Sequence, residues 1–305
     1  MTNILFIAGM HRSLTSAFAG AALLLQENAK GPMIGPSGSN AKGHFEPISV
    51  VSANKALIAA RLRVWFDCRP MPQVSVATAE VEIAELVKVL VTEWEGDGLQ
   101  VVKDPRISLF VSAWFAAARR AELKPHLVGM VRNPAASAAS LCRRDKLDFN
   151  YAVSIWLRYM FDLERDTRGL ARKFVDAAAF SSAPVTVLAD VAATLGLTWS
   201  RQPESARDSL LAFVDPALPS PATAADCDLL PIAFEVQSLL LSRDTHQTRD
   251  RLDGLATAFN AMAPALYEEM VLRELGRCLH DRWELDATRA RLAEVEQSVQ
   301  QQRAQ

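Results

Sequence analysis

Three groups of basic and hydroxyl residues in this chain of 305 residues have the chemistry to bind a negatively charged ligand. They are Gly9-Met10-His11-Arg12-Ser13-Leu14-Thr15-Ser16, then Lys103-Asp104-Pro105-Arg106, and then Arg132-Asn133-Pro134 with Ser140 eight residues after Arg132. Arginine and lysine side chains form charge-assisted hydrogen bonds with phosphate-like groups. The sequence therefore indicates a ligand with phosphate-like groups, provided that the fold brings the three groups together.

The first group has the surroundings of a phosphate-binding loop. It follows the apolar run 4–8 and precedes the helix-like run 17–26, which predicts a strand, a tight polar loop and a helix. Backbone N–H groups at a helix start have no partner within the helix, and the helix dipole favours an anion there. A Walker A loop needs Gly and Lys where this chain has Leu14 and Thr15. Because the cation stands at Arg12 instead, the loop predicts a donor other than MgATP.

Apolar runs alternate with amphipathic stretches along much of the chain. The apolar runs predict strands at 4–8, 99–103 and 126–131, and a weaker strand at either 173–175 or 184–187. The amphipathic stretches predict helices near 15–27, 48–61, 78–95, 107–120, 134–143 and 148–170. This alternation predicts an α/β fold with a parallel central sheet and helices on both faces. Each basic group follows a predicted strand, so the three should meet at the carboxyl edge of the sheet.

Composition argues against several classes of protein. The formal net charge of −2 gives no global positive field for nucleic acid, so a local cluster must bind any anion. The four cysteines include no C-x-x-C pair, which argues against a disulfide framework and a zinc site. The N-terminal apolar run is too short for a signal peptide, and no apolar stretch has the length of a membrane span. We therefore expect a cytoplasmic protein without a transmembrane segment.

The chain is expected to divide into a domain at 1–245 and a helical C-terminal extension at 246–305. Residues 246–303 are charged and almost free of Gly and Pro, which predicts a long exposed helix or a helical hairpin. An apolar seam repeats every seven residues, at Cys278, Leu285, Leu292 and Val299. The companion seam carries Arg282, Arg289 and Glu296, which argues against a strong coiled coil. Self-association through this helix is the alternative to a solvated extension.

The order and spacing of the basic groups resemble the sulfotransferase family that uses 3′-phosphoadenosine 5′-phosphosulfate (PAPS). The first group resembles the phosphosulfate loop of bacterial members, and Arg132 with Ser140 is similar to their 3′-phosphate block. The segment 103–106 and the run Asn40-Ala41-Lys42-Gly43-His44-Phe45-Glu46 also resemble blocks of such members. The resemblance covers roughly residues 3–195 and implies a P-loop-like sulfotransferase fold. It places Arg12, Ser13, Leu14, Thr15 and Ser16 at the phosphosulfate, and Arg132 and Ser140 at the 3′-phosphate.

The resemblance also implies in-line transfer of a sulfuryl group to a hydroxyl or amine of a small molecule, glycan or lipid. Such transfer depends on positioning and on stabilising charge, by analogy with phosphoryl transfer. Arg12 would neutralise the leaving oxygen and Lys103 would be a second cation, so no metal ion is expected. Glu46 is the first choice for the general base and His44 the second.

Two other functions stay open. A kinase-like P-loop enzyme would need an acid after an apolar strand, and Asp104 is the sole candidate. A catalytically degenerate fold used as a binding module is the other, and Leu14 is its main support. The family has Gly at that position, which can adopt a positive φ. We expect Leu14 to lie already within the helix, on an apolar face with Phe18 and Leu25, and a positive φ would contradict this.

Several residues near these groups have structural interpretations. We expect His11 to be structural, and Trp156 and Tyr159 to lie in the core. Arg143-Arg144-Asp145 is interpreted as a solvated helix end, with contact to a donor phosphate as the alternative.

Overall fold

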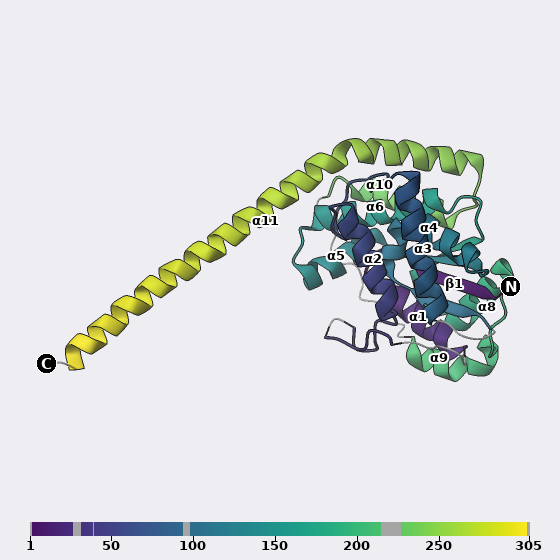
Figure 1. The fold of residues 1–305 in the computed structure, drawn as a ribbon, viewed down its shortest axis with the longest axis horizontal. Coiled ribbons are helices and arrows are strands. Elements are labelled where there is room, and N and C mark those ends of the chain that lie inside the picture. The colour runs from purple at the N-terminus through teal and green to yellow at the C-terminus, as the bar shows by residue number, and fades with distance from the viewer. Residues whose placement is uncertain (1, 27–31, 39, 94–97, 215–226, 304–305) are drawn as a thin grey trace.

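The central sheet has four parallel strands, in the order β2-β1-β3-β4, in the part of the chain that the structure describes (Figure 1). This computed structural model describes residues 2–26, 32–38, 40–93, 98–214 and 227–303. The strands are β1 (Asn3–Ala8), β2 (Gln100–Lys103), β3 (Lys124–Val131) and β4 (Arg172–Asp176). Nearly every residue of β1 and β3 is buried, as expected for inner strands of a covered parallel sheet.

Helices pack on both faces of the sheet. Phe6 of β1 faces one core cluster and Leu5 faces the other, as the two-residue period of a strand requires. The first cluster includes residues of α2 (Ile48–Ala60), α3 (Val76–Glu93), η1 (Pro105–Leu109), α4 (Val111–Arg120), α5 (Pro134–Asp145), α6 (Phe149–Asp166) and α10 (Leu230–Leu241). The second includes residues of α1 (Thr15–Leu24), α7 (Ala177–Ser182), α8 (Pro184–Leu195), η2 (Pro203–Ala206) and α9 (Arg207–Phe213). The predicted α/β architecture is therefore confirmed.

The predicted strands agree with the structure except at one position. β1, β2 and β3 begin and end within two residues of their predicted bounds. Of the two choices for the weaker strand, 173–175 is correct and 184–187 is wrong. Pro184 stands in the first turn of α8, where its missing N–H costs no hydrogen bond. Trp156 and Tyr159 are fully buried on α6, so their expected place in the core is confirmed.

The loop after β1 leaves the sheet at a topological switch point. β2 lies on one side of β1, while β3 and β4 lie on the other. Ligands of open parallel sheets bind at the carboxyl ends of the strands beside such a switch. Gly9 follows β1 with a φ of 138°, and a Cβ there would lie 2.6 Å from the carbonyl oxygen of Met130 on β3. Glycine is therefore required for the loop to pass this close to β3.

The C-terminal helix α11 (His246–Arg303) is a single helix of 58 residues (Figure 1). Its first part packs on the first core cluster through Leu252, Leu255, Phe259, Ala263 and Met270. Its last part projects away from the body. The predicted long helix is therefore present, and the alternative of a helical hairpin is wrong. The first part of α11 shares a hydrophobic core with residues before 246, so it does not form a separate packing unit. The division of the chain into 1–245 and 246–305 therefore stays a prediction.

Part of the seven-residue seam of α11 can be placed. Cys278 is exposed, whereas the side chains of Leu285, Leu292 and Val299 lie outside the described part of the structure. None of the described helices is long and apolar enough to cross a membrane.

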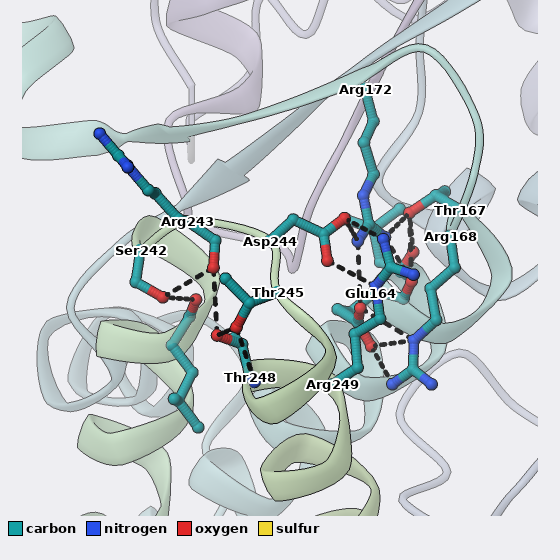
Figure 2. Close-up of polar contacts among 12 residues, drawn as sticks. Glu164, Thr167, Arg168, Arg172, Ser242, Arg243, Asp244, Thr245, Thr248 and Arg249 are labelled. Carbon is teal, nitrogen blue, oxygen red and sulfur yellow. Dashed lines mark hydrogen bonds and ion pairs between the residues drawn. The ribbon is translucent and has the colours of Figure 1, made fainter.

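A network of charged residues, which we call the clasp, ties the start of α11 to α6 and β4 (Figure 2). Its members are Glu164, Arg168, Arg172, Asp244, Arg249 and Asp253. Arg172 Nη2 lies 3.1 Å from Glu164 Oε1 and 3.0 Å from Asp244 Oδ2. Arg168 pairs with Glu164 and Asp253, and Arg249 pairs with Asp244. The clasp therefore matches three arginines with three carboxylates.

Candidate active site

The ends of β1, β2 and β3 open into one cavity of about 180 Å³. The residues that line it are His11, Arg12, Leu14, Thr15, Ser16, Ala17, Asn40, His44, Glu46, Lys103, Pro105, Arg132 and Arg144. Of the predicted site residues, only Ser13 and Ser140 do not line the cavity. The three basic groups of the sequence therefore meet at the carboxyl edge of the sheet, together with the segment 40–46.

The loop after β1 differs from its prediction at Leu14. This residue precedes α1 with φ 62° and ψ 17°, so it lies outside the helix in the left-handed region. The expectation that Leu14 belongs to the helix is therefore wrong. Arg12 also has a positive φ, of 69°. Residues other than glycine seldom adopt such angles, so the loop is strained at two positions.

Despite this strain, the loop keeps the backbone donors of an anion site. The Ser13 N–H donates to the carbonyl of Met10, and the Phe18 N–H donates to the carbonyl of Leu14, which begins α1. Leu14 gives the helix no side-chain cap. The first-turn N–H groups, including that of Ser16, therefore have no helical partner and can bind an anion.

Two serines predicted as ligands face the helix α5 and the loop, not the cavity. Ser13 is fully buried, and its Oγ lies 3.4 Å from Ser137 Oγ on α5. Ser140 Oγ accepts a hydrogen bond of 2.9 Å from Arg12 Nε. Arg132 Nη1 in turn donates to the carbonyl oxygen of Arg12 at 2.7 Å. The two hydroxyls therefore hold the loop against α5. The hydrogen bond from Arg132 to the carbonyl of Arg12 brings these two arginines together.

Lys103 is buried at the cavity and is already paired. Its Nζ lies 2.5 Å from Glu46 Oε1, 2.9 Å from Ser16 Oγ and 3.1 Å from the carbonyl oxygen of His44. Burial lowers the pKa of Lys103, and the Glu46 carboxylate opposes that shift. Lys103 thus connects the loop and the segment 40–46, and an anion at the cavity would compete with Glu46 for it.

The ion pairs continue behind Lys103. Glu46 Oε2 lies 3.3 Å from Arg106 Nη2, so both of its oxygens contact cations. Asp104 accepts a hydrogen bond of 2.8 Å from Arg106 Nε and one of 3.0 Å from Asn54 Nδ2. Asp104 therefore holds the guanidinium of Arg106 in place behind Lys103.

The two histidines of the cavity have different surroundings. His44 is partly exposed, and its Nε2 lies 2.8 Å from Ser37 Oγ. Burial lowers the pKa of His44, although Glu46 opposes the shift, so burial favours the neutral imidazole. A neutral ring nitrogen can accept a proton, which is the chemistry of a general base.

His11 packs between aromatic rings. Its ring centroid lies 4.5 Å from that of Trp65 and 5.8 Å from that of Tyr159. Burial, followed by the charge of Arg144 and other cations, lowers the pKa of His11 well below its usual value. These contacts agree with the structural role expected for His11.

Positive charge is in excess at the cavity. Among the described residues that line it, Arg12, Lys103, Arg132 and Arg144 face a single carboxylate, that of Glu46. Burial lowers the pKa of both Arg12 and Arg132, and neighbouring arginines lower both values further. Holding like charges together in a partly buried site is unfavourable, and a bound anion relieves it. The arrangement therefore suits a ligand with several negative charges.

For one cation of this cavity, the structure favours the alternative interpretation of the sequence over the first one. Arg144 was interpreted first as part of a solvated helix end and second as a contact to a donor phosphate; it lines the cavity, whereas its neighbour Arg143 is exposed. The signal for the alternative is the spacing of four residues between Ser140 and Arg144, which places both on one face of a helix.

No protein-family model matches the chain, and no curated protein matches it. Three solved structures show a partial likeness. The sulfotransferase domain of a Synechococcus olefin synthase has a TM-score of 0.44 and 13% identity, over 80% of this chain and 96% of its own. A sulfotransferase from Alicyclobacillus acidocaldarius has a TM-score of 0.43 and 16% identity, over 82% and 99%. A sulfotransferase from Mycobacterium avium has a TM-score of 0.44 and 14% identity, over 69% and 68%. With TM-scores below 0.5, the assignment of function depends on the site itself.

Proposed function

We propose that this protein is a PAPS-dependent sulfotransferase that needs no metal ion. The observation that carries the proposal is the meeting of three strand ends at one cavity, where Arg12, Lys103 and Arg132 lie beside the open first turn of α1. PAPS presents a phosphosulfate at one end and a 3′-phosphate at the other, and a cavity with excess positive charge suits such a polyanion. The resemblance of the loop and of the Arg132–Ser140 pair to this family supports the same conclusion.

The donor would bind along α5 and the loop. Backbone N–H groups of the first turn, with Thr15 and Ser16, would bind the phosphosulfate. Arg132 would make a bidentate contact with the 3′-phosphate, and Ser140 would hold the side chain of Arg12. Arg12 lies between these positions, since its side chain bonds Ser140 while its backbone belongs to the loop.

Catalysis would depend on charge at the transferred group. Lys103 would stabilise the sulfuryl group, and Arg12 would neutralise the leaving oxygen. Of the two candidate bases, the contacts favour His44, because both oxygens of Glu46 contact cations while burial favours the neutral form of the His44 ring. In this proposal Glu46 holds Lys103 in place, and an acceptor hydroxyl or amine loses its proton to His44.

Contacts of Asp104 count against a kinase-like enzyme. Its two carboxylate oxygens bind Arg106 and Asn54, which leaves this acid poorly placed to serve as the Walker B residue.

The acceptor in our proposal is a small molecule, a glycan or a lipid, and the protein acts in the cytoplasm.

Ligand-induced stabilisation tests the donor. A ligand that binds the folded state alone stabilises it by about 2.7 kcal/mol at 100 times its Kd. Adenosine 3′,5′-bisphosphate should raise the melting temperature, MgATP should not, and Arg132→Ala should abolish the rise. A rise with MgATP alone would instead support the kinase-like enzyme. The absence of a rise with both ligands would support a degenerate binding module.

A second experiment tests the base. We would screen hydroxyl and amine acceptors with labelled PAPS, and then compare His44→Gln and Glu46→Gln on the best acceptor. His44→Gln should lose turnover at every pH while it still binds the bisphosphate. Full turnover by His44→Gln, with loss in Glu46→Gln, would return the role of base to Glu46.

A further inference from the structure

One face of α5 contacts the loop after β1 and reaches the cavity. Ser137, Ser140 and Arg144 are spaced by three and four residues, which places them on one stripe of the helix. Ser137 lies against Ser13, Ser140 bonds Arg12, and Arg144 lines the cavity. Along this stripe, the two serines hold the loop, and the arginine that follows them lines the cavity where a ligand would bind.

Arg144 is held in position by two neighbours. Its Nε and Nη2 lie 2.8 Å and 2.7 Å from Asp145 Oδ2, and its guanidinium lies 5.5 Å from the ring centroid of Trp65. Because the ion pair uses Nε and Nη2, Nη1 is the nitrogen that can donate to a ligand. The backbone carbonyl of Trp65 accepts a hydrogen bond from the Tyr159 hydroxyl at 2.8 Å, and its ring packs against His11 with the ring centroids 4.5 Å apart. A guanidinium restrained in this way loses little freedom when it binds an anion.

The charge of Arg144 acts on the loop already in the absence of ligand. After burial, Arg144 is the largest cause that lowers the pKa of Arg12, while Asp145 offsets part of that effect. Arg144 is also the largest cause, after burial, that lowers the pKa of His11. Arg144 and Arg12 are thus close enough to repel each other, and an anion between them would remove that repulsion.

We infer that Arg144 binds the 3′-phosphate of the donor together with Arg132, which lines the same cavity. The choice of this phosphate follows from the helix, because Ser140 and Arg144 share one face of α5 and Arg132 immediately precedes it. The identity of the donor in this inference rests on the proposed function. The contact between Arg144 and an anion rests only on the place of Arg144 in the cavity. Arg144 is a binding residue here and takes no part in proton transfer.

The chain offers a matched control one residue away. Arg143 has the same charge on the same helix turn, and this charge also acts on Arg12 and Arg132, but its side chain is exposed and does not line the cavity. We would measure Kd by titration calorimetry for adenosine 3′,5′-bisphosphate and for adenosine 5′-monophosphate, which lacks the 3′-phosphate. Arg144→Ala should weaken the bisphosphate by about 10- to 100-fold and the monophosphate by less than about 3-fold. Arg143→Ala should change both by less than about 3-fold, and Arg144→Lys should lie between the two alanine variants.

Each other result overturns a defined part of the inference. Equal losses for both nucleotides in Arg144→Ala would move Arg144 to the 5′ end of the donor. Equal behaviour of Arg144→Ala and Arg143→Ala would remove Arg144 from the site. Misfolding of Arg144→Ala would show as a lower melting temperature without ligand, and Arg144→Lys, which keeps the charge, would then carry the comparison.

Inorganic pyrophosphate separates the inference from the proposed function. If the wild-type protein binds bisphosphate no better than monophosphate, the proposed donor is wrong. Arg144→Ala should still weaken pyrophosphate more than Arg143→Ala does. An equal effect of both variants on pyrophosphate would overturn the role of Arg144 as an anion ligand.

Discussion

The cavity and the clasp are built from the same charged side chains but in opposite proportions. The clasp matches three arginines with three carboxylates, and Figure 2 labels all of these residues except Asp253. Among the described residues that line the cavity, four cations face one carboxylate. In the clasp, every cation has a partner from the protein, so the network contributes to folding. In the cavity, Lys103 pairs with Glu46 and Arg144 pairs with Asp145, but positive charge remains in excess among the lining residues, so we expect these cations to contribute more to binding than to folding.

The largest effect is expected from breaking the clasp at Arg172. Its side chain is 9% exposed and joins Glu164 to Asp244. Removing one partner of a buried pair leaves the other charge unpaired, so Arg172→Met should lower the free energy of unfolding by about 3 kcal/mol. Urea denaturation measures this change, and calorimetry should show unchanged affinity for the bisphosphate.

Arg207→Met is the control for Arg172→Met. Arg207 pairs with Glu204 at the surface, where both side chains are more than half exposed. Its replacement should cost less than about 1 kcal/mol. A loss at Arg172 no larger than at Arg207 would show that the clasp does not stabilise the fold.

The reverse result is expected at the cavity. Arg132→Ala should weaken the bisphosphate by about 100-fold, because a bidentate charged contact is lost. The free energy of unfolding without ligand should change by less than about 0.5 kcal/mol, since the variant also removes a charge that burial and Arg12 disfavour. A large loss of stability in Arg132→Ala would contradict the division of roles between cavity and clasp.

The clasp also predicts a dependence on pH. Hydrogen bonds from Arg249, and then from Arg172, hold the pKa of Asp244 at about 2 against the opposing effect of burial. A lowered pKa means that the ionised form stabilises the fold above about pH 4, and that this contribution is lost as the pH falls through 2. Because Asp244 is 42% exposed, solvent screening limits the effect to about 1 kcal/mol. Asp244→Asn should therefore be less stable than wild type at pH 7 and equally stable below pH 2, as measured by urea denaturation.

The smallest effect on stability is expected at Leu14. Glycine at this position would remove about 1 kcal/mol of backbone strain from the left-handed conformation. It would also lose the packing of the leucine side chain and increase the conformational freedom of the unfolded chain, and both effects are destabilising. Leu14→Gly should therefore change the free energy of unfolding by less than about 0.5 kcal/mol and leave bisphosphate affinity unchanged or higher. Leu14→Ala keeps the strained φ and should be less stable than Leu14→Gly. The opposite order of the two variants would show that the loop is not strained at this position.

Elements with an unambiguous hydrophobic pattern could be predicted from the sequence. The run 4–8 is apolar throughout, which suits a strand covered on both faces, and β1 is such a strand. β4 was ambiguous because it lies at the edge of the sheet and only Val175 in it is fully buried. The segment 184–187 has the composition of a strand, but Pro184 opens a helix there.

The candidate site could be predicted as a meeting of segments but not in its contacts. Parallel strands bring their carboxyl ends to one edge, so the approach of Lys103 and Arg132 to the loop followed from the strand assignments. Which way a loop side chain turns depends on φ and ψ, which sequence does not give. For that reason the burial of Ser13 against α5 and the left-handed Leu14 were not predicted.

The length of α11 determines which methods can measure the molar mass of this protein in solution correctly. At 1.5 Å per residue its 58 residues extend about 87 Å, and much of that length stands clear of the body. A compact particle with such an arm tumbles and diffuses more slowly than a sphere of equal mass. Its elution from a sizing column will therefore overstate its mass and can imitate a dimer. Sedimentation equilibrium or light scattering, which do not depend on shape in this way, are the measurements that can count its subunits.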